Sequence, residues 1–252
     1  MSNPHDPSSP AAAPVAEVPP ATDHPMADPV ALALGRLMAI PETSEGTSIT
    51  DEIEAANRLR WRAKLRAAAN LPERAVRVLS GPGQPDWWQR MWLLAENRLR
   101  KKPGAMLALH GMQGRGKTVF ACAWALDYLD RGKSARYIDL LELEELYDAA
   151  RGPLEGEDRA ALEFATENSI TVGLGREGPA LLIIDECGKS RSTDYVMRKF
   201  FLLVNQRYNA DLDTIFISNL PEKEFADWLG SSLTDRINEN GGLMAFKGEG
   251  LR

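Results

Sequence analysis

The 252-residue chain has little cysteine and histidine, and it lacks any long hydrophobic run. Its two cysteines, Cys122 and Cys187, exclude a disulfide scaffold, and no Cys or His pair has the spacing of zinc ligands. No unbroken apolar run approaches the roughly 20 residues that a membrane-spanning helix needs. No basic region precedes an apolar stretch at the amino terminus, where the first cation is Arg36. We therefore expect a cytoplasmic protein rather than a secreted or membrane protein.

Charge is distributed unevenly along the chain, whose formal net charge is −6. Residues 1–50 contain six acidic residues and one basic residue, whereas residues 51–102 contain twelve basic and six acidic residues. The remainder of the chain is acidic again. Because the main body is acidic, any contact with nucleic acid there must come from local cations.

The amino-terminal segment is rich in proline, with nine of the 16 prolines before Glu42. A stretch of Pro, Ala, Ser and Asp buries too little apolar surface to offset its ordering entropy, so we predict that residues 1–27 are disordered. Residues 29–40 (PVALALGRLMAI) are predicted to form a short amphipathic helix that Pro41 ends. The segment is interpreted either as a flexible tether to a partner or as an unstructured leader.

The basic segment is predicted to contain two helices, separated by the turn-rich residues 72–83. Thr50 can cap the first helix, which continues to Asn70. Five cations of this helix surround Trp61, namely Arg58, Arg60, Arg62, Lys64 and Arg66. They form either a surface for phosphates or an acidic partner, or a solvated face around one buried tryptophan. The second predicted helix, 86–101, is rich in tryptophan.

From Ala105 onward, short apolar runs alternate with longer helical segments. The candidate strands are Met106–Leu109, Ala135–Asp139, Leu181–Ile184, Thr214–Ser218 and Leu243–Phe246. Alternation of strands and helices is typical of a parallel sheet that is covered on both faces. The sequence therefore predicts an α/β fold.

The first candidate strand leads directly into a glycine-rich loop, GMQGRGKT at residues 111–118, which matches the pattern G-x-x-x-x-G-K-[ST]. The glycines let successive backbone N–H groups converge on phosphate oxygens. Lys117 would place its charge between the β- and γ-phosphates, and Thr118 would offer its hydroxyl to magnesium. The helix at 119–130 would point its positive end at the same anion. The candidate nucleotide-binding residues are Gly111, Gln113, Gly114, Arg115, Gly116, Lys117, Thr118 and Val119.

A second apolar strand ends in two consecutive carboxylates, Asp185 and Glu186. Ligands of open parallel sheets bind at the carboxyl ends of the strands, so these acids are expected near the glycine-rich loop. Asp185 is predicted to hold magnesium through water, and Glu186 to act as a general base on the attacking water. Adjacent strand residues point to different sides, which suits two acids with different tasks.

Two polar residues later in the chain complete the predicted catalytic set. Asn219 follows the strand Thr214–Ser218 and is expected beside Glu186, where it could orient the water. Arg236, in the run LTDRI, is predicted to reach the γ-phosphate of a neighbouring subunit as an arginine finger. Taken by itself, Arg236 is interpreted as a surface cation, because Asp-Arg dipeptides are common.

Together, these segments resemble the AAA+ ATPases of the DnaC/IstB family, the bacterial or phage replicative helicase loaders and transposition helper ATPases. The resemblance covers about residues 71–252 and rests on GMQGRGKT, LLIIDECG, NQRYNADLDTIFISNLP, LTDRI and the terminal FKGEGLR. It implies that Asn219 is the sensor residue, that Arg236 acts in trans, and that Arg252 is a further cation near the nucleotide. It also implies a P-loop AAA+ three-layer sandwich at 71–252 without a carboxy-terminal lid, preceded by a helical partner-binding region at 28–70.

The resemblance further implies the ligands and partners. These are ATP and Mg²⁺, single-stranded DNA, a replicative helicase held by the amino-terminal region, and further copies of the chain in an ATP-dependent oligomer. The alternatives are a transposition helper whose partner is a transposase, and a nucleotide-gated adaptor with negligible hydrolysis. The cations Lys189, Arg191, Arg198 and Lys199 are interpreted either as DNA contacts or as a solvated helix surface.

Overall fold

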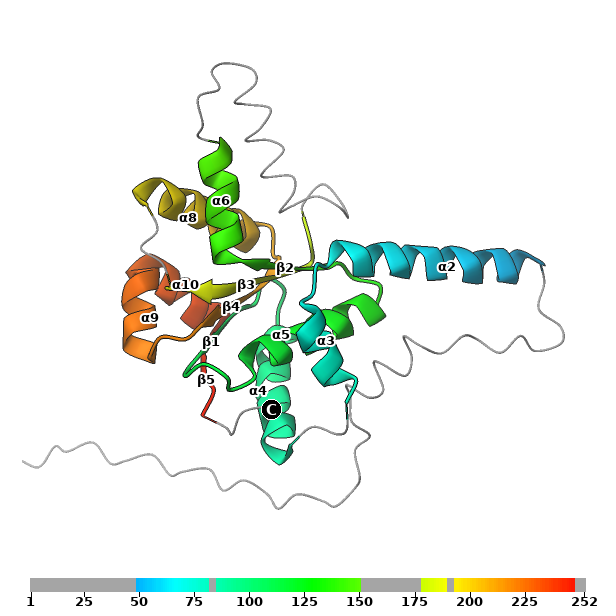
Figure 1. The fold of residues 1–252 in the computed structure, drawn as a ribbon, viewed down its shortest axis with the longest axis horizontal. Helices are drawn as coiled ribbons and strands as arrows, with labels where there is room; N and C mark the ends of the chain where they lie inside the picture. Colours follow the sequence, from blue (N-terminus) through cyan, green and yellow to red (C-terminus); the bar gives the residue numbers. More distant parts are fainter. Residues whose placement is uncertain (1–48, 82–84, 151–177, 190–192, 248–252) are drawn as a thin grey trace, which may run out of the picture.

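The computed structural model describes residues 49–81, 85–150, 178–189 and 193–247 (Figure 1). The segments predicted to be disordered, at 1–27, and helical, at 29–40, lie outside these residues, as does Arg252. The first helices of the described part are α2 (Ile49–Ala68), α3 (Glu73–Leu79), α4 (Asp86–Leu99) and α5 (Lys117–Asp130). The later ones are α6 (Leu140–Ala150), α8 (Asp194–Asn209), α9 (Glu222–Leu229) and α10 (Ser231–Asn240).

Five parallel strands form one sheet. They are β1 (Met106–His110), β2 (Ala135–Asp139), β3 (Leu181–Cys187), β4 (Asp213–Ser218) and β5 (Gly241–Ala245), in the spatial order β2-β3-β4-β1-β5. Strand β4 lies between β1 and β3. Strand β1 lies in turn between β4 and β5, so that Ala108 of β1 pairs with Phe216 of β4 on one side and Leu243 of β5 on the other. The parallel α/β fold predicted from the sequence is confirmed.

Helices cover both faces of the sheet. Successive strand residues point to opposite faces, so that alternate residues of each strand pack against different helices. Leu107 and Leu109 belong to one hydrophobic cluster, with buried residues of α2, α3, α4 and α5. Met106 and Ala108 belong to the other, with buried residues of α6, α8, α9 and α10. Figure 1 shows these two groups of helices on opposite sides of the strands, with α2 extending away from the body.

The tryptophan-rich helix α4 belongs to the core. The rings of Trp92 on α4 and Trp124 on α5 stack 4.2 Å apart, and Trp88 meets Phe120 edge to face at 5.0 Å. Stacked and edge-to-face pairs add to the hydrophobic stabilisation of buried aromatic side chains. Within the described parts of the chain, none of the helices combines the length and apolarity that crossing a membrane requires.

Helix ends differ from the sequence predictions by one or two residues. Helix α2 begins at Ile49, so Thr50 lies within its first turn rather than at its cap. Helix α4 ends at Leu99, and Arg100 is its C-cap. The short helix α3 was not predicted, because two turns carry too little periodicity to detect. It is held by Ala75 and Leu79, which are buried four residues apart.

A buried arginine, Arg207, fastens α8 to the amino-terminal ends of two strands. Its side chain is 2% exposed and donates to Thr214 Oγ1 at 2.9 Å, to Pro179 O at 3.0 Å and to Asp213 O at 2.6 Å. Burial lowers the pKa of its guanidinium to about 9, against the opposing effect of Asp213. The Arg-Tyr dipeptide that carried part of the family resemblance therefore has a structural role in this fold.

Candidate nucleotide-binding and catalytic site

The glycine-rich loop connects the end of β1 to the start of α5. Gly111 adopts a φ of 127°, and a Cβ atom there would lie 2.7 Å from the carbonyl oxygen of Phe246. Gly116 is the N-cap of α5 in the left-handed region, with a φ of 86°. The loop thus turns tightly, and the first N–H groups of α5, which have no partner within the helix, face the loop. Such a helix terminus is a binding site for anionic groups.

Lys117, the first residue of α5, reaches back across this loop. Its Nζ atom donates to the carbonyl oxygens of Gly111 at 2.6 Å and Met112 at 2.9 Å, and to Asn219 Oδ1 at 2.9 Å. Burial lowers the pKa of the Lys117 amine, while the carboxylates of Asp185 and Glu186 oppose that shift. A buried ammonium with only neutral acceptors in contact has strong affinity for phosphate oxygens.

The carboxylate of Asp185 lies against α5 and β2. Its Oδ2 atom accepts hydrogen bonds from Thr118 Oγ1 at 2.6 Å and from Tyr137 OH at 3.0 Å, and Oδ1 accepts from the N–H of Glu186 at 2.7 Å. The side chain is thereby fixed in one orientation beside the start of α5. Burial raises the pKa of the Tyr137 hydroxyl, and the charge of Asp185 raises it further, so Tyr137 stays a donor.

Glu186 points to a different set of partners. The register of β3 against β4 shifts between Ile184 and Cys187, and Glu186 adopts a left-handed φ of 57°. Its Oε2 atom accepts from Asn219 Nδ2 at 2.9 Å, and Oε1 lies 3.5 Å from Lys189 Nζ. A β-bulge re-aims side chains, and unusual backbone conformations recur at functional sites. Asp185 and Glu186 therefore serve separate groups of residues.

The donor set suits magnesium. Thr118 Oγ1 and Asp185 Oδ2 lie 2.6 Å apart, and both are oxygen ligands. Mg²⁺ is usually held by one or two protein oxygens, waters and substrate phosphates rather than by an all-protein cage. Among the residues that the structure describes, no group of three or more His, Cys, Asp or Glu side chains could hold a metal ion.

Arg236 lies on α10 and contacts α8. Its Nη1 atom donates to Asn205 Oδ1, and its guanidinium lies 5.4 Å from the centre of the Tyr208 ring. The structure thus does not bring Arg236 into contact with Lys117 or Glu186 of its own chain. An action on a neighbouring copy is the arrangement that the sequence predicted, and it stays a prediction.

The remaining predicted site residues take varied positions. Gln113 and Gly114 are exposed at the tip of the loop, and Arg115 is half-buried. Val119, on α5, is partly buried and packs against the core cluster. Among the candidate DNA contacts, Lys189 pairs with Glu186, and Arg191 lies outside the described residues.

Sequence reasoning missed two residues at this site. Tyr137 contacts Asp185 only because β2 pairs with β3, a register that no local motif indicates. His110, the last residue of β1, is buried below the loop with Nε2 at 3.5 Å from Glu222 Oε2. Burial lowers the pKa of His110, and the nearby carboxylate of Glu222 opposes that shift. The only available signal was its place directly before Gly111.

Comparisons with known proteins give a family match and a set of similar folds. The family described as IstB-like ATP binding protein matches residues 100–252. A crystal structure of DnaI has a TM-score of 0.51 and 20% identity, covering 73% of this chain and 95% of that one. A crystal structure of the DnaC helicase loader has a TM-score of 0.50 and 19% identity, covering 68% and 96%. A DNA replication initiation factor has a TM-score of 0.51 and 15% identity, covering 67% of this chain and 48% of that one.

No curated protein matches the chain significantly. The solved structures share little sequence with it, and their likeness shows the fold: an α/β P-loop sandwich of the AAA+ type. The family match covers more than half of the chain and includes the loop at 111–118, both acids of β3 and Asn219. The chain therefore belongs to the IstB-like ATP-binding protein family, with the AAA+ fold of the DnaC/IstB group.

Proposed function

We propose that this protein is a Mg²⁺-dependent AAA+ ATPase that hydrolyses ATP at the interfaces of an oligomer and loads a replicative helicase onto single-stranded DNA. One observation carries the enzymatic part. Asn219 accepts from Lys117 and donates to Glu186, both at 2.9 Å, so a cation, an amide and a carboxylate from three segments form one chain of hydrogen bonds. That chain lies beside Thr118 and Asp185, the two oxygen ligands suited to magnesium.

Each residue has a distinct task in the proposed reaction. Lys117 neutralises the charge of the β- and γ-phosphates, and the backbone of the glycine-rich loop binds the same oxygens. Glu186 accepts the proton of the attacking water, and Asn219 orients that water and holds Glu186 in place. Thr118 and Asp185 would hold Mg²⁺, which neutralises developing charge on the phosphates when bound. Arg236 acts on the nucleotide of a neighbouring copy.

The helicase-loader role is supported by the fold of the DnaC helicase loader, which this chain shares at low identity. The family description favours a second candidate, a transposition helper, because it names IstB-like proteins. Both candidates use the same nucleotide chemistry and differ only in the partner. A nucleotide-gated adaptor is a third possibility, and it requires that hydrolysis be negligible.

Co-purification tests the partner directly. We expect the full-length chain to retain the replicative helicase of the same organism on affinity resin in the presence of ATP, and to release it as ATP is hydrolysed. The Glu186→Gln variant should bind nucleotide without turning it over, so its complex should persist. Retention of a transposase but not of the helicase would contradict the loader role and support the transposition helper.

A further inference from the structure

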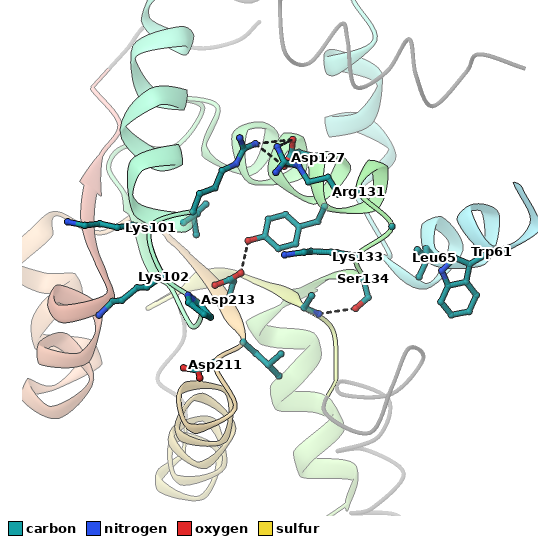
Figure 2. A pocket seen from close by; sticks show the side chains of 17 residues that line it. Trp61, Leu65, Lys101, Lys102, Asp127, Arg131, Lys133, Ser134, Asp211 and Asp213 are labelled. Atoms are coloured by element: carbon teal, nitrogen blue, oxygen red, sulfur yellow. Dashed lines mark hydrogen bonds and ion pairs between the residues drawn. The ribbon is translucent and has the colours of Figure 1, made fainter. Parts of the chain in front are cut away.

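A cavity of about 660 Å³ lies at the amino-terminal ends of the strands, whereas the glycine-rich loop follows the carboxyl-terminal end of β1. Figure 2 shows the side chains that line this cavity. Ser134, Ala180 and Asp213 line it, and these residues stand at the amino-terminal starts of β2, β3 and β4. Asp213 begins β4 and Asn219 directly follows its end, so the cavity and the nucleotide site are separated by about 20 Å, the length of that strand.

The arginines that line this cavity are already paired. Arg100 binds Asp127 at 3.2 Å, and Arg131 binds the same carboxylate at 3.1 Å. Another acid of the lining, the half-buried Asp213, is also satisfied, because it accepts from Tyr128 OH at 2.6 Å and from the N–H of Ala105 at 2.8 Å. These groups hold the walls of the cavity together and offer little charge to a ligand.

The lysines, in contrast, are available. Lys101 and Lys102 are exposed and make no ion pair or hydrogen bond with any residue that the structure describes. Lys133 is also exposed, and its Nζ atom lies 5.6 Å from the centre of the Tyr128 ring. The exposed acid at this cavity is Asp211, so the free charge on its rim is positive.

An exposed aromatic ring completes the cavity. Trp61 on α2 is 48% exposed although its neighbour Leu65 is 1% exposed and anchors the helix. The alternative that Trp61 is a buried core residue of a solvated helix is therefore wrong. Figure 2 shows Trp61 and Leu65 at one end of the cavity, Lys101 and Lys102 at the other, and Lys133 between them. The lining of the cavity thus has an aromatic end and a cationic end.

We propose that this cavity binds a segment of single-stranded nucleic acid, with a base stacked on Trp61 and the backbone phosphates along Lys133, Lys101 and Lys102. Single-strand binding sites combine cations that follow the backbone with aromatic side chains on which bases stack. Exposed cations on α2, Arg60, Arg62 and Lys64, extend the positive surface on either side of Trp61. That the polymer is single-stranded nucleic acid rests on the proposed function. The structure adds its location, at the amino-terminal ends of the strands, away from the ATP site.

A nucleic acid fits this cavity better than an acidic peptide does. Carboxylates are best matched by the planar fork of arginine, and both arginines here are occupied by Asp127. The free cations are lysines, which act as point charges and suit phosphates spaced along a backbone. An exposed indole offers a ring face to any unpaired base, which a carboxylate side chain cannot use.

Fluorescence anisotropy with the full-length chain and a labelled oligo(dT) of about 20 nucleotides, longer than common single-strand sites, tests this inference without nucleotide present. We expect Trp61→Ala to weaken binding about tenfold, with Trp61→Phe restoring most of the affinity. The double variant Lys101→Ala/Lys102→Ala should lower the slope of log affinity against log salt by about 1.4, since each single-strand phosphate contact contributes about 0.7.

Lys223→Ala is the matched control, because Lys223 is exposed on α9 and does not line the cavity. ATP turnover without DNA should be the same in all these variants, which checks their folding.

Oligo(dT) affinity and salt slope equal to wild type in both the Trp61 and the lysine variants would overturn the proposal. The proposal would also be overturned, in favour of an acidic partner, if the Lys101→Ala/Lys102→Ala variant lost affinity for labelled poly-glutamate but kept wild-type affinity for oligo(dT). The oligo(dT) measurement is made without nucleotide, so its result does not depend on whether the chain binds or hydrolyses ATP. Failure of this inference is therefore distinguishable from failure of the ATPase proposal.

Discussion

Replacing Arg236 by alanine is expected to lower the kcat of ATP hydrolysis by about 10³-fold or more, because arginine fingers contribute 10³–10⁵ in kcat. Nucleotide affinity should stay within about twofold of wild type, since Arg236 contacts Asn205 and Tyr208 rather than the glycine-rich loop of its own chain. Single-turnover rates and titration with a fluorescent ATP analogue separate the two effects. Arg74→Ala, at an exposed arginine on α3, is the matched control.

Mixing two inactive variants tests whether Arg236 acts in trans. An Arg236→Ala chain retains its nucleotide site, and a Lys117→Ala chain retains its arginine, so an interface between them contains one complete set of residues. We therefore expect partial recovery of turnover on mixing, and turnover per chain that rises with protein concentration. Weakened nucleotide binding in Arg236→Ala itself would place this arginine at its own chain's site and contradict the proposed role.

Glu186→Gln is expected to lower kcat by about 10²–10⁴-fold, the usual contribution of a general base. The amide oxygen of glutamine can still accept from Asn219 Nδ2, so the substitution removes the basicity and keeps the geometry. Nucleotide affinity should therefore be retained. Steady-state phosphate release measures the change, and Glu239→Gln, at an exposed site on α10, serves as the control.

The same measurement separates an ATPase from a nucleotide-gated adaptor. If wild type and Glu186→Gln show equal, near-zero turnover, with Mg²⁺ and at high protein concentration, then Glu186 has no catalytic task. That result would contradict the proposed hydrolysis and support the adaptor. Turnover that is present in wild type and lost in Glu186→Gln would support the general-base role.

The sequence predicted the framework of this fold well for a physical reason. Strands buried on both faces read as short apolar runs, and a glycine-rich loop between a strand and a helix constrains its own backbone. The positions of Lys117 and Asp185 followed from these local patterns together with the rule that ligands bind at the carboxyl ends of parallel strands.

Features that depend on long-range packing were not predictable in the same way. Tyr137 reaches Asp185 through the pairing of β2 with β3, and the bulge at Glu186 arises from the register of β3 against β4. The cavity between Trp61 and Lys102 exists because Leu65 anchors α2 against the body, 36 positions before Lys101. None of these contacts leaves a periodic signal in the residues around it.

The central claim is that the glycine-rich loop and Lys117 hold the phosphates of ATP opposite the acids of β3. Titration of Lys117→Ala with a fluorescent ATP analogue tests it most directly, with thermal unfolding as the check that the variant folds. A charge-assisted hydrogen bond contributes about 1.5–3 kcal/mol, so we expect affinity to fall by about 10- to 150-fold. Affinity equal to wild type in a folded Lys117→Ala protein would contradict the account.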